Sequence, residues 1–309
     1  MSAMMSRLVF PAVLMAAAGL ALGDNRTIDG TGNNLINPVW GCVNSPLMRG
    51  ASGAHYLDGI GQMMPRANPR AASNALSDQT VGGLGNARNL SSMFWQWGQF
   101  IDHDFALVDE SSLPGESAPI AIPAGDPVFD PMNTGTATMP FQRSVCVDGV
   151  NSPRQAPNAI THWVDGSGVY GSDELRAATL RAGVGGRLAT SAGNMMPFNT
   201  AGLPNAGGLG AAGYLAGDVR SNEQTGLTAM HTIFVREHNR LADAISSANP
   251  GMSDEDVYQR ARRLVGAEVQ AITYNEWLPA LLGGHGLDSY AGYNDSVNPT
   301  LDTAFTTAA

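Results

Sequence analysis

The sequence contains little cysteine. Only Cys42 and Cys146 occur in 309 residues, which is too few for a disulfide-rich scaffold but enough for one bridge in an oxidising compartment. Neither lies in a CxxC motif or at zinc-ligand spacing from a histidine, so the sequence argues against thiol catalysis and zinc binding. Whether the two cysteines pair with each other is left open at this point.

Basic residues are also scarce. The 17 Lys and Arg residues are outnumbered by 27 Asp and Glu residues, and the formal net charge is −10. Nucleic-acid binding requires clustered positive charge, whereas these cations are scattered. We therefore exclude nucleic acid as a partner and expect a small or neutral substrate. The hydrophobic content of 43% allows a full core in one large domain or two modest ones.

No apolar run is long enough to span a membrane. The longest, residues 8–22, has about 15 residues, fewer than the roughly 20 that cross a bilayer. It follows Arg7 and precedes Ala21-Leu22-Gly23, which predicts a signal peptide over residues 1–23. A membrane anchor or a misassigned start is the alternative. We expect an exported protein, extracellular or periplasmic, with one domain over residues 24–309 and no membrane attachment after cleavage.

The pattern of apolar residues predicts a mainly α-helical core with long, loop-rich connections and little β structure. Periodicity of three and four residues indicates helices over residues 89–107, over residues 226–247, and from Ser253 towards Pro279. Ser253 is a candidate N-cap because acidic residues follow it at the positive end of the helix dipole. Residues 24–89 and 111–158 are rich in Gly, Asn, Pro and Ser, which indicates irregular connections.

The densest polar cluster lies inside the first predicted helix, in residues 97–105. Gln99 and His103 are four residues apart, so a helix projects them from one face with Asp102 close by. Such a face suits catalysis. The alternative is a helix with a solvated acidic edge and one structural core histidine.

Two further segments carry polar groups at suggestive spacing. In residues 161–172 the alternating positions 161, 163, 165 and 167 can turn hydroxyl, carboxylate and main-chain oxygens towards one centre, as calcium requires; an ordinary turn is the alternative. In residues 216–224, Arg220 and Glu223 are three residues apart. In isolation that pair is no more than a surface ion pair.

In this order, the three segments resemble the animal-type haem peroxidases of the cyclooxygenase superfamily, the group of myeloperoxidase, lactoperoxidase, peroxidasin and their bacterial relatives. The resemblance spans about residues 25–309. It includes further matching stretches at residues 27–30, 169–172, 230–232, 236–241 and 272–279.

The resemblance implies a haem b enzyme that reduces hydrogen peroxide and oxidises a small donor. His103 matches the distal histidine, which moves a proton between the peroxide oxygens. Arg220 matches the distal arginine, which stabilises negative charge on the leaving oxygen, and Gln99 matches a residue that binds distal water or halide. Asp102 and Glu223 match the two positions that form ester bonds to haem.

The resemblance also implies a calcium site that ties the distal helix to a loop. Its matching ligands are Asp104, Thr161, Trp163 through its carbonyl, Asp165 and Ser167. Asp102 and Asp104 are then expected to have different roles, because residues two apart on a helix point about 200° apart.

The sequence departs from the family pattern at two places. Gln224 stands where myeloperoxidase has a methionine linked to haem, so we expect attachment by esters only, and bromide, iodide, thiocyanate or phenols as donors rather than chloride. Residues 293–309 resemble the approach to an Arg-x-x-His segment that carries the iron-binding proximal histidine, and the chain ends before it.

The remaining histidines are poor substitutes for that ligand. His55 and His285 lie in Gly-rich loops, and His162 alternates away from the proposed calcium ligands. His231 and His238 match family positions that are not iron ligands. We therefore expect the N-terminal part of a peroxidase domain, truncated at its C-terminus, for which a complementing C-terminal segment is a candidate partner. The alternative is a catalytically inactive, calcium-stabilised fragment or adhesion module without haem.

Overall fold

The computed structural model describes residues 25–50, 55–78, 82, 85–113, 115–147, 153–283 and 286–308. The predicted signal peptide lies outside them. Helices are the main regular structure of this part of the chain, and the mainly α-helical class is confirmed. None of its helices is both long and apolar enough to cross a membrane.

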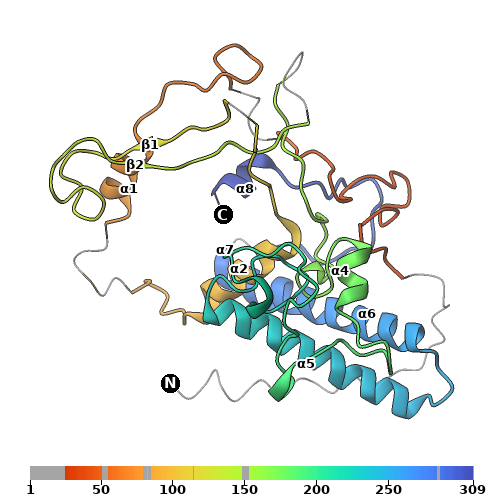
Figure 1. Ribbon diagram of the computed structural model, residues 1–309. Coiled ribbons are helices and arrows are strands. Elements are labelled where there is room, and N and C mark those ends of the chain that lie inside the picture. The colour runs from red at the N-terminus through yellow and green to blue at the C-terminus, as the bar shows by residue number, and fades with distance from the viewer. Residues whose placement is uncertain are drawn as a thin grey trace.

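The three predicted helices form the body of the molecule (Figure 1). They are α2 (Met93–Phe105), α5 (Thr225–Ala248) and α6 (Asp254–Ile272), and α2 and α6 both pack against α5. Ser253 caps α6 as expected, because its side chain accepts a hydrogen bond from the Asp256 amide. The chain continues from α6 through a π-helical turn, η3 (Thr273–Trp277), into α7 (Leu278–Leu282).

Aromatic packing holds α2 in the body. Phe100 of α2 is fully buried and stacks on Phe234 of α5, with 5.1 Å between the ring centroids. Trp97 donates a hydrogen bond of 3.3 Å to Thr273, and Trp277 stacks on Phe94 at 5.5 Å. Burying one such ring stabilises the fold by roughly 2–3 kcal/mol. The polar face of α2 is thereby held in a fixed orientation.

Short elements fill the connections between the long helices. Besides α3 (Ser167–Tyr170), which packs against α2 and α5, they are α4 (Glu174–Thr179), η1 (Ala192–Asn194), η2 (Gly210–Ala212) and α8 (Thr303–Ala308). The loop before α5 touches α3 closely. A Cβ atom on Gly217 would lie 2.1 Å from the Ser167 carbonyl oxygen.

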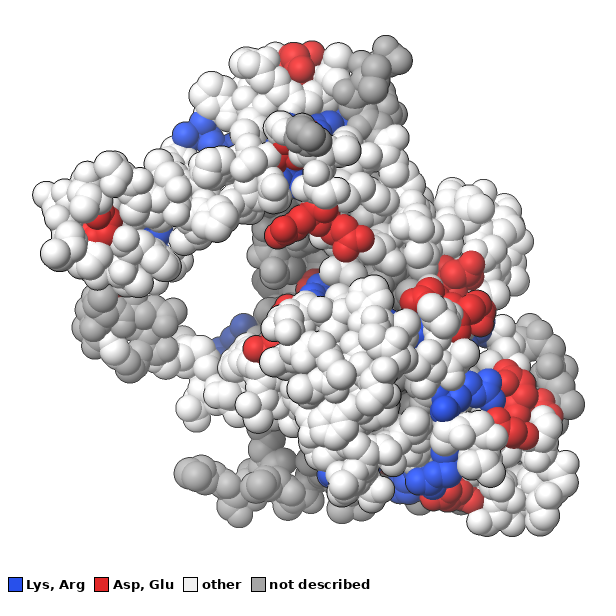
Figure 2. Space-filling view, in the orientation of Figure 1, with Lys and Arg blue, Asp and Glu red and all other residues white. Residues whose placement is uncertain are grey.

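A lobe built from the loop-rich segments projects from this body. It contains α1 (Pro69–Leu76) and the antiparallel strands β1 (Ile120–Ala121) and β2 (Thr138–Met139), which pair Ile120 with Met139. Asp126 closes the lobe by a two-point ion pair with Arg70 of α1. Figure 2 shows open space between the lobe and the body.

The N-terminal arm, residues 25–50, runs beside the C-terminal segment. Met48 donates its amide to the Leu301 carbonyl at 2.8 Å, and Asn34 donates to the Asp295 carbonyl at 2.9 Å. Cys42 and Cys146 are free thiols. Because the sequence contains no lysine, every blue side chain in Figure 2 is an arginine.

Candidate active site

The structure brings Arg220 to the C-terminal end of α2, where His103 lies. The Arg220 guanidinium donates to the Ala106 carbonyl at 2.8 Å and to the His103 carbonyl at 3.5 Å. These carbonyls end the helix, where partial negative charge favours a cation. The helix and the loop before α5 thus place side by side two groups that are 117 positions apart in the sequence.

His103 is nearly enclosed, at 5% exposure. Burial and, to a smaller extent, the positive charge of Arg220 together lower its pKa to about 4, against the opposing effect of Asp218. The imidazole is therefore neutral near pH 7 and can accept a proton. Of its two ring nitrogens, Nδ1 is the one that is buried without a hydrogen-bond partner.

Gln99 lies one turn before His103 and belongs to a network of amides and one carboxylate. It donates to Glu223 at 3.1 Å and accepts from Gln224 at 3.0 Å. Gln224 also donates to Gln96 at 2.9 Å. The network joins α2 to the segment before α5 and holds Glu223 at the edge of α2.

Asp102 is half-buried on the same helix. Burial raises the pKa of its carboxyl group, and the positive charge of Arg220 opposes the rise. Asp102 and Arg220 are therefore electrostatic neighbours. The structure thus gathers Gln99, His103, Arg220 and Glu223 with Asp102 at one end of α2.

Asp104 points away from that group, into the loop at residues 165–168. It is fully buried and accepts hydrogen bonds from the amides of Asp165, Gly166 and Gly168 at 2.9–3.1 Å. The Ser167 hydroxyl donates to the Asp104 carbonyl. Asp104 is thus enclosed by the loop at residues 165–168, whereas Asp102 is only half-buried and senses the charge of Arg220; their different roles stay a prediction.

The oxygens proposed for calcium converge around Asp104 and Asp165. Thr161 donates its hydroxyl to Asp165 at 3.0 Å. Burial, joined for Asp104 by the charge of Asp165, raises the pKa of both carboxyl groups. Two enclosed carboxylates with hydroxyl and carbonyl oxygens suit a hard cation, although the described residues hold no group of three His, Cys, Asp or Glu placed for a metal. The part played by the Trp163 carbonyl stays a prediction.

Sequence reasoning missed Asp218. Its side chain is 2% exposed and binds Arg220 through both oxygens, at 3.0 and 2.7 Å. Its Oδ1 atom lies 3.6 Å from Nδ1 of His103. The sequence signal for this contact was the Asp-x-Arg spacing, because an Asp side chain often accepts a hydrogen bond from the backbone amide two residues later. Here Asp218 accepts one from the Arg220 amide at 2.7 Å.

The other described histidines are occupied or distant. His162 binds Ser45 and Leu301, and His238 binds Tyr170 and Gly186. His55 is exposed on a loop. His231 is completely enclosed beside Asp218 and His103. The groups gathered at this end of α2 have the chemistry that a haem peroxidase site requires: a neutral imidazole, a guanidinium and two carboxylates.

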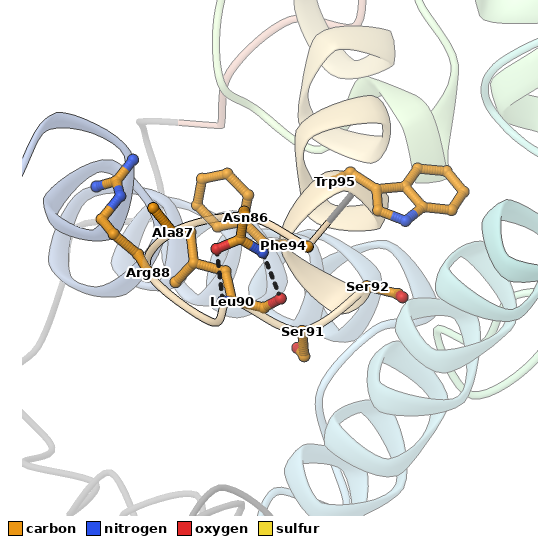
Figure 3. A pocket seen from close by; sticks show the side chains of 9 residues that line it. Asn86, Ala87, Arg88, Leu90, Ser91, Ser92, Phe94 and Trp95 are labelled. Carbon is orange, nitrogen blue, oxygen red and sulfur yellow. Dashed lines mark hydrogen bonds between the residues drawn. The ribbon is translucent and has the colours of Figure 1, made fainter. Parts of the chain in front are cut away.

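A separate pocket of about 550 Å³ opens at the N-terminal end of α2 (Figure 3). Asn86 and Leu90 form its rim through two mutual hydrogen bonds of 2.9 and 2.8 Å, and Trp95 lies at one side. None of the residues predicted for catalysis or metal binding lines it. The chemistry at the other end of α2 is better supported as the site.

Comparison with known proteins identifies the family. A sequence model described as "Animal haem peroxidase" matches residues 25–309. Myeloperoxidase from Mus musculus is 36% identical over 92% of this chain and 45% of that protein. Peroxinectin A from Dictyostelium discoideum is 33% identical over 92% of this chain and 56% of that protein. The chain thus spans about half the length of these relatives.

Solved structures agree with the sequence comparison. Peroxidase A from Dictyostelium discoideum superposes with a TM-score of 0.83 at 32% identity, covering 92% of this chain and 58% of that one. A fatty acid alpha-dioxygenase from Oryza sativa shares the fold, with a TM-score of 0.68 at 22% identity over 92% of this chain and 48% of that one. The chain belongs to the animal haem peroxidase family.

Proposed function

We propose that this chain carries the distal half of a haem peroxidase site, which reduces hydrogen peroxide and oxidises a small donor. The observation that carries the proposal is the placement of neutral His103 beside Arg220, with Asp102 and Glu223 at the same end of α2. Bound haem b would supply the iron at which peroxide is reduced.

The roles of the protein groups follow from their charges. His103 accepts a proton from peroxide at one oxygen and returns it to the other, which suits an imidazole that is neutral near pH 7. Arg220 stabilises the negative charge that develops on the leaving oxygen. Gln99 offers an amide for hydrogen bonding to water or halide in the same space.

Asp102 and Glu223 are the groups proposed to hold haem b, through ester bonds. Gln224 is committed to Gln96 and Gln99, and an amide offers no sulfur for a further link. We infer bromide, iodide, thiocyanate or phenols as donors. We also propose export to the extracellular space or periplasm, with calcium bound by Asp104, Asp165 and their neighbours.

A second candidate function is a calcium-stabilised module of the same fold without haem. It is favoured by the two enclosed carboxylates of Asp104 and Asp165, which suit a cation whether or not haem is bound. The two candidates differ in whether the chain binds haem.

A haem titration of residues 24–309 tests the proposal. We expect saturable binding with a Soret band, and iodide oxidation that falls about 10²–10⁴-fold in His103→Gln while haem affinity is kept. His162→Gln is the matched control, because His162 is similarly buried but lies outside the site. Absence of saturable binding would favour the second candidate, and equal loss of rate and haem binding in His103→Gln would make His103 structural.

A further inference from the structure

Asp218 is the buried charge of the site that the proposed roles leave unused. Its amide donates to the Gly168 carbonyl at 3.0 Å, which fixes the backbone against α3. The preceding Gly217 has no room for a side chain, because an added Cβ atom would lie 2.1 Å from the Ser167 carbonyl oxygen and 2.6 Å from the Tyr170 amide nitrogen. The carboxylate is therefore held in one place by main-chain packing.

The Asp218 carboxylate is ionised in this position. Burial opposes ionisation, but the bonds and charge of Arg220 outweigh it and lower the pKa of Asp218 below its ordinary value. Arg220 donates three hydrogen bonds to this carboxylate, from its backbone amide, its Nε and its Nη2. Arg220 is thus fixed both in its backbone and at its guanidinium.

The same carboxylate lies beside one of the two ring nitrogens of His103. Nδ1 lies 3.6 Å from Asp218 Oδ1 and has no hydrogen-bond partner among the described residues. A lone pair on Nδ1 would repel the ionised carboxylate, whereas an N–H there is attracted to it. In the neutral ring the other nitrogen, Nε2, then bears the lone pair.

We propose that Asp218 is the positioning residue of the distal site: it holds His103 in the Nδ1–H tautomer, so that Nε2 is the proton acceptor, and it orients the Arg220 guanidinium beside it. The inference rests on the proposed function for its catalytic meaning, but the tautomer is a property of the protein alone. His231, the other enclosed histidine beside Asp218, and the carboxylates of Asp102 and Asp104 complete the charged surroundings.

Nitrogen-15 NMR of the histidine-labelled chain, without haem and near pH 7.5, tests the inference. Long-range couplings to the ring protons distinguish the two tautomers, and His103→Gln identifies the His103 signals among the six histidines. We expect the Nδ1–H tautomer in the native chain. The Nε2–H tautomer would overturn the inference without any variant having to fold.

Asp218→Asn supplies the second arm. In this variant we expect the His103 signals to report the Nε2–H tautomer or a mixture of both tautomers, instead of the Nδ1–H tautomer alone. Asp126→Asn is the matched control, since Asp126 is also 2% exposed and binds Arg70 through both oxygens at 2.6 and 3.0 Å. Unchanged His103 signals in Asp218→Asn, or equal changes in both variants, would overturn the inference.

The outcome is separable from that of the proposed function. A native chain with the Nδ1–H tautomer that binds no haem contradicts the proposed function and leaves the positioning role of Asp218 intact. A chain that binds haem and turns over peroxide with the Nε2–H tautomer contradicts the inference alone.

Discussion

At the scale of single residues, His162 joins the two ends of the described chain. Its Nδ1 accepts the Leu301 amide at 2.9 Å, and its Nε2 lies 2.9 Å from the Ser45 hydroxyl. Because Nδ1 accepts a hydrogen bond, Nε2 carries the proton of the neutral ring. Burial lowers the pKa of His162 to about 4, against the opposing effect of the Ser45 backbone.

This low pKa predicts a loss of stability in mild acid. In the unfolded chain His162 binds a proton near pH 6.5, but in the folded chain only near pH 4. The stability that the neutral ring contributes to the folded state is therefore complete well above pH 6.5 and declines as the pH falls towards 4. We expect His162→Gln to reduce the fall in unfolding free energy between pH 7 and 4 by about 3 kcal/mol. Urea denaturation at both pH values measures it.

The exposed His55 supplies the control for that experiment, as His55→Gln. Its unfolding free energy should keep the pH dependence of the native chain. If His162→Gln kept the native pH dependence of the unfolding free energy, the pKa of His162 would not be lowered by its buried position.

The limits of sequence reasoning are also clearest at this scale. The proximity of His103 and Arg220 was predicted through a family resemblance, because each sits in a recognisable motif. Asp218 was missed because its importance arises from a contact with a residue 115 positions away, and nothing local distinguishes it from an ordinary turn aspartate. The role of Gln96 depends in the same way on Gln224, which lies on another element.

At the scale of elements, the contact between α3 and the loop before α5 positions the site. A methyl group on Gly217 would meet the Ser167 carbonyl at 2.1 Å and the Gly171 amide at 2.4 Å. We expect Gly217→Ala to reduce the unfolding free energy by about 3 kcal/mol, because two backbones must separate. Urea denaturation measures the change.

Gly251→Ala is the control for this effect, since nothing lies within 4 Å of an added methyl group there. We expect a change within about 0.5 kcal/mol. If the two variants were equally stable, the close approach at Gly217 would be wrong.

The proposed calcium site also acts between elements, because it joins α2 to α3. Removing calcium would leave the buried Asp104 and Asp165 facing each other without a cation. At a calcium concentration of about 100 times the dissociation constant, we expect chelation to cost about 2.7 kcal/mol and to lower Tm by roughly 5–10 °C. Asp104→Asn should remove most of this response, and a native melting curve indifferent to chelator would contradict the site.

At the scale of the whole molecule, the lobe and the body are held together by different interactions. The body has an aromatic and aliphatic core, whereas the lobe depends on Asp126, which binds Arg70, Asn74 and the amides of Val128 and Phe129. We expect Asp126→Asn to accelerate hydrogen exchange at the Val128 and Phe129 amides by about tenfold or more, with the buried amides of α5 unchanged. Uniform acceleration would mean that lobe and body unfold as one unit.

The same division explains how much of the architecture was predictable. The three long helices were predicted to within a few residues because each buries a periodic apolar face. The lobe, with α1 and its two-residue strands, was read only as irregular connection. Its order comes from side chains such as Asp126 that bond across more than 50 positions, and such contacts leave no periodic trace in the sequence.

The 117 positions between His103 and Arg220 have a consequence during protein synthesis. At about 5–20 residues per second, the ribosome releases Arg220 roughly 6–23 s after His103. During that interval α2 has neither the cation at its C-terminal end nor Phe234 against its apolar face. A nascent chain stalled before residue 234 should therefore keep α2 open to proteases and chaperones.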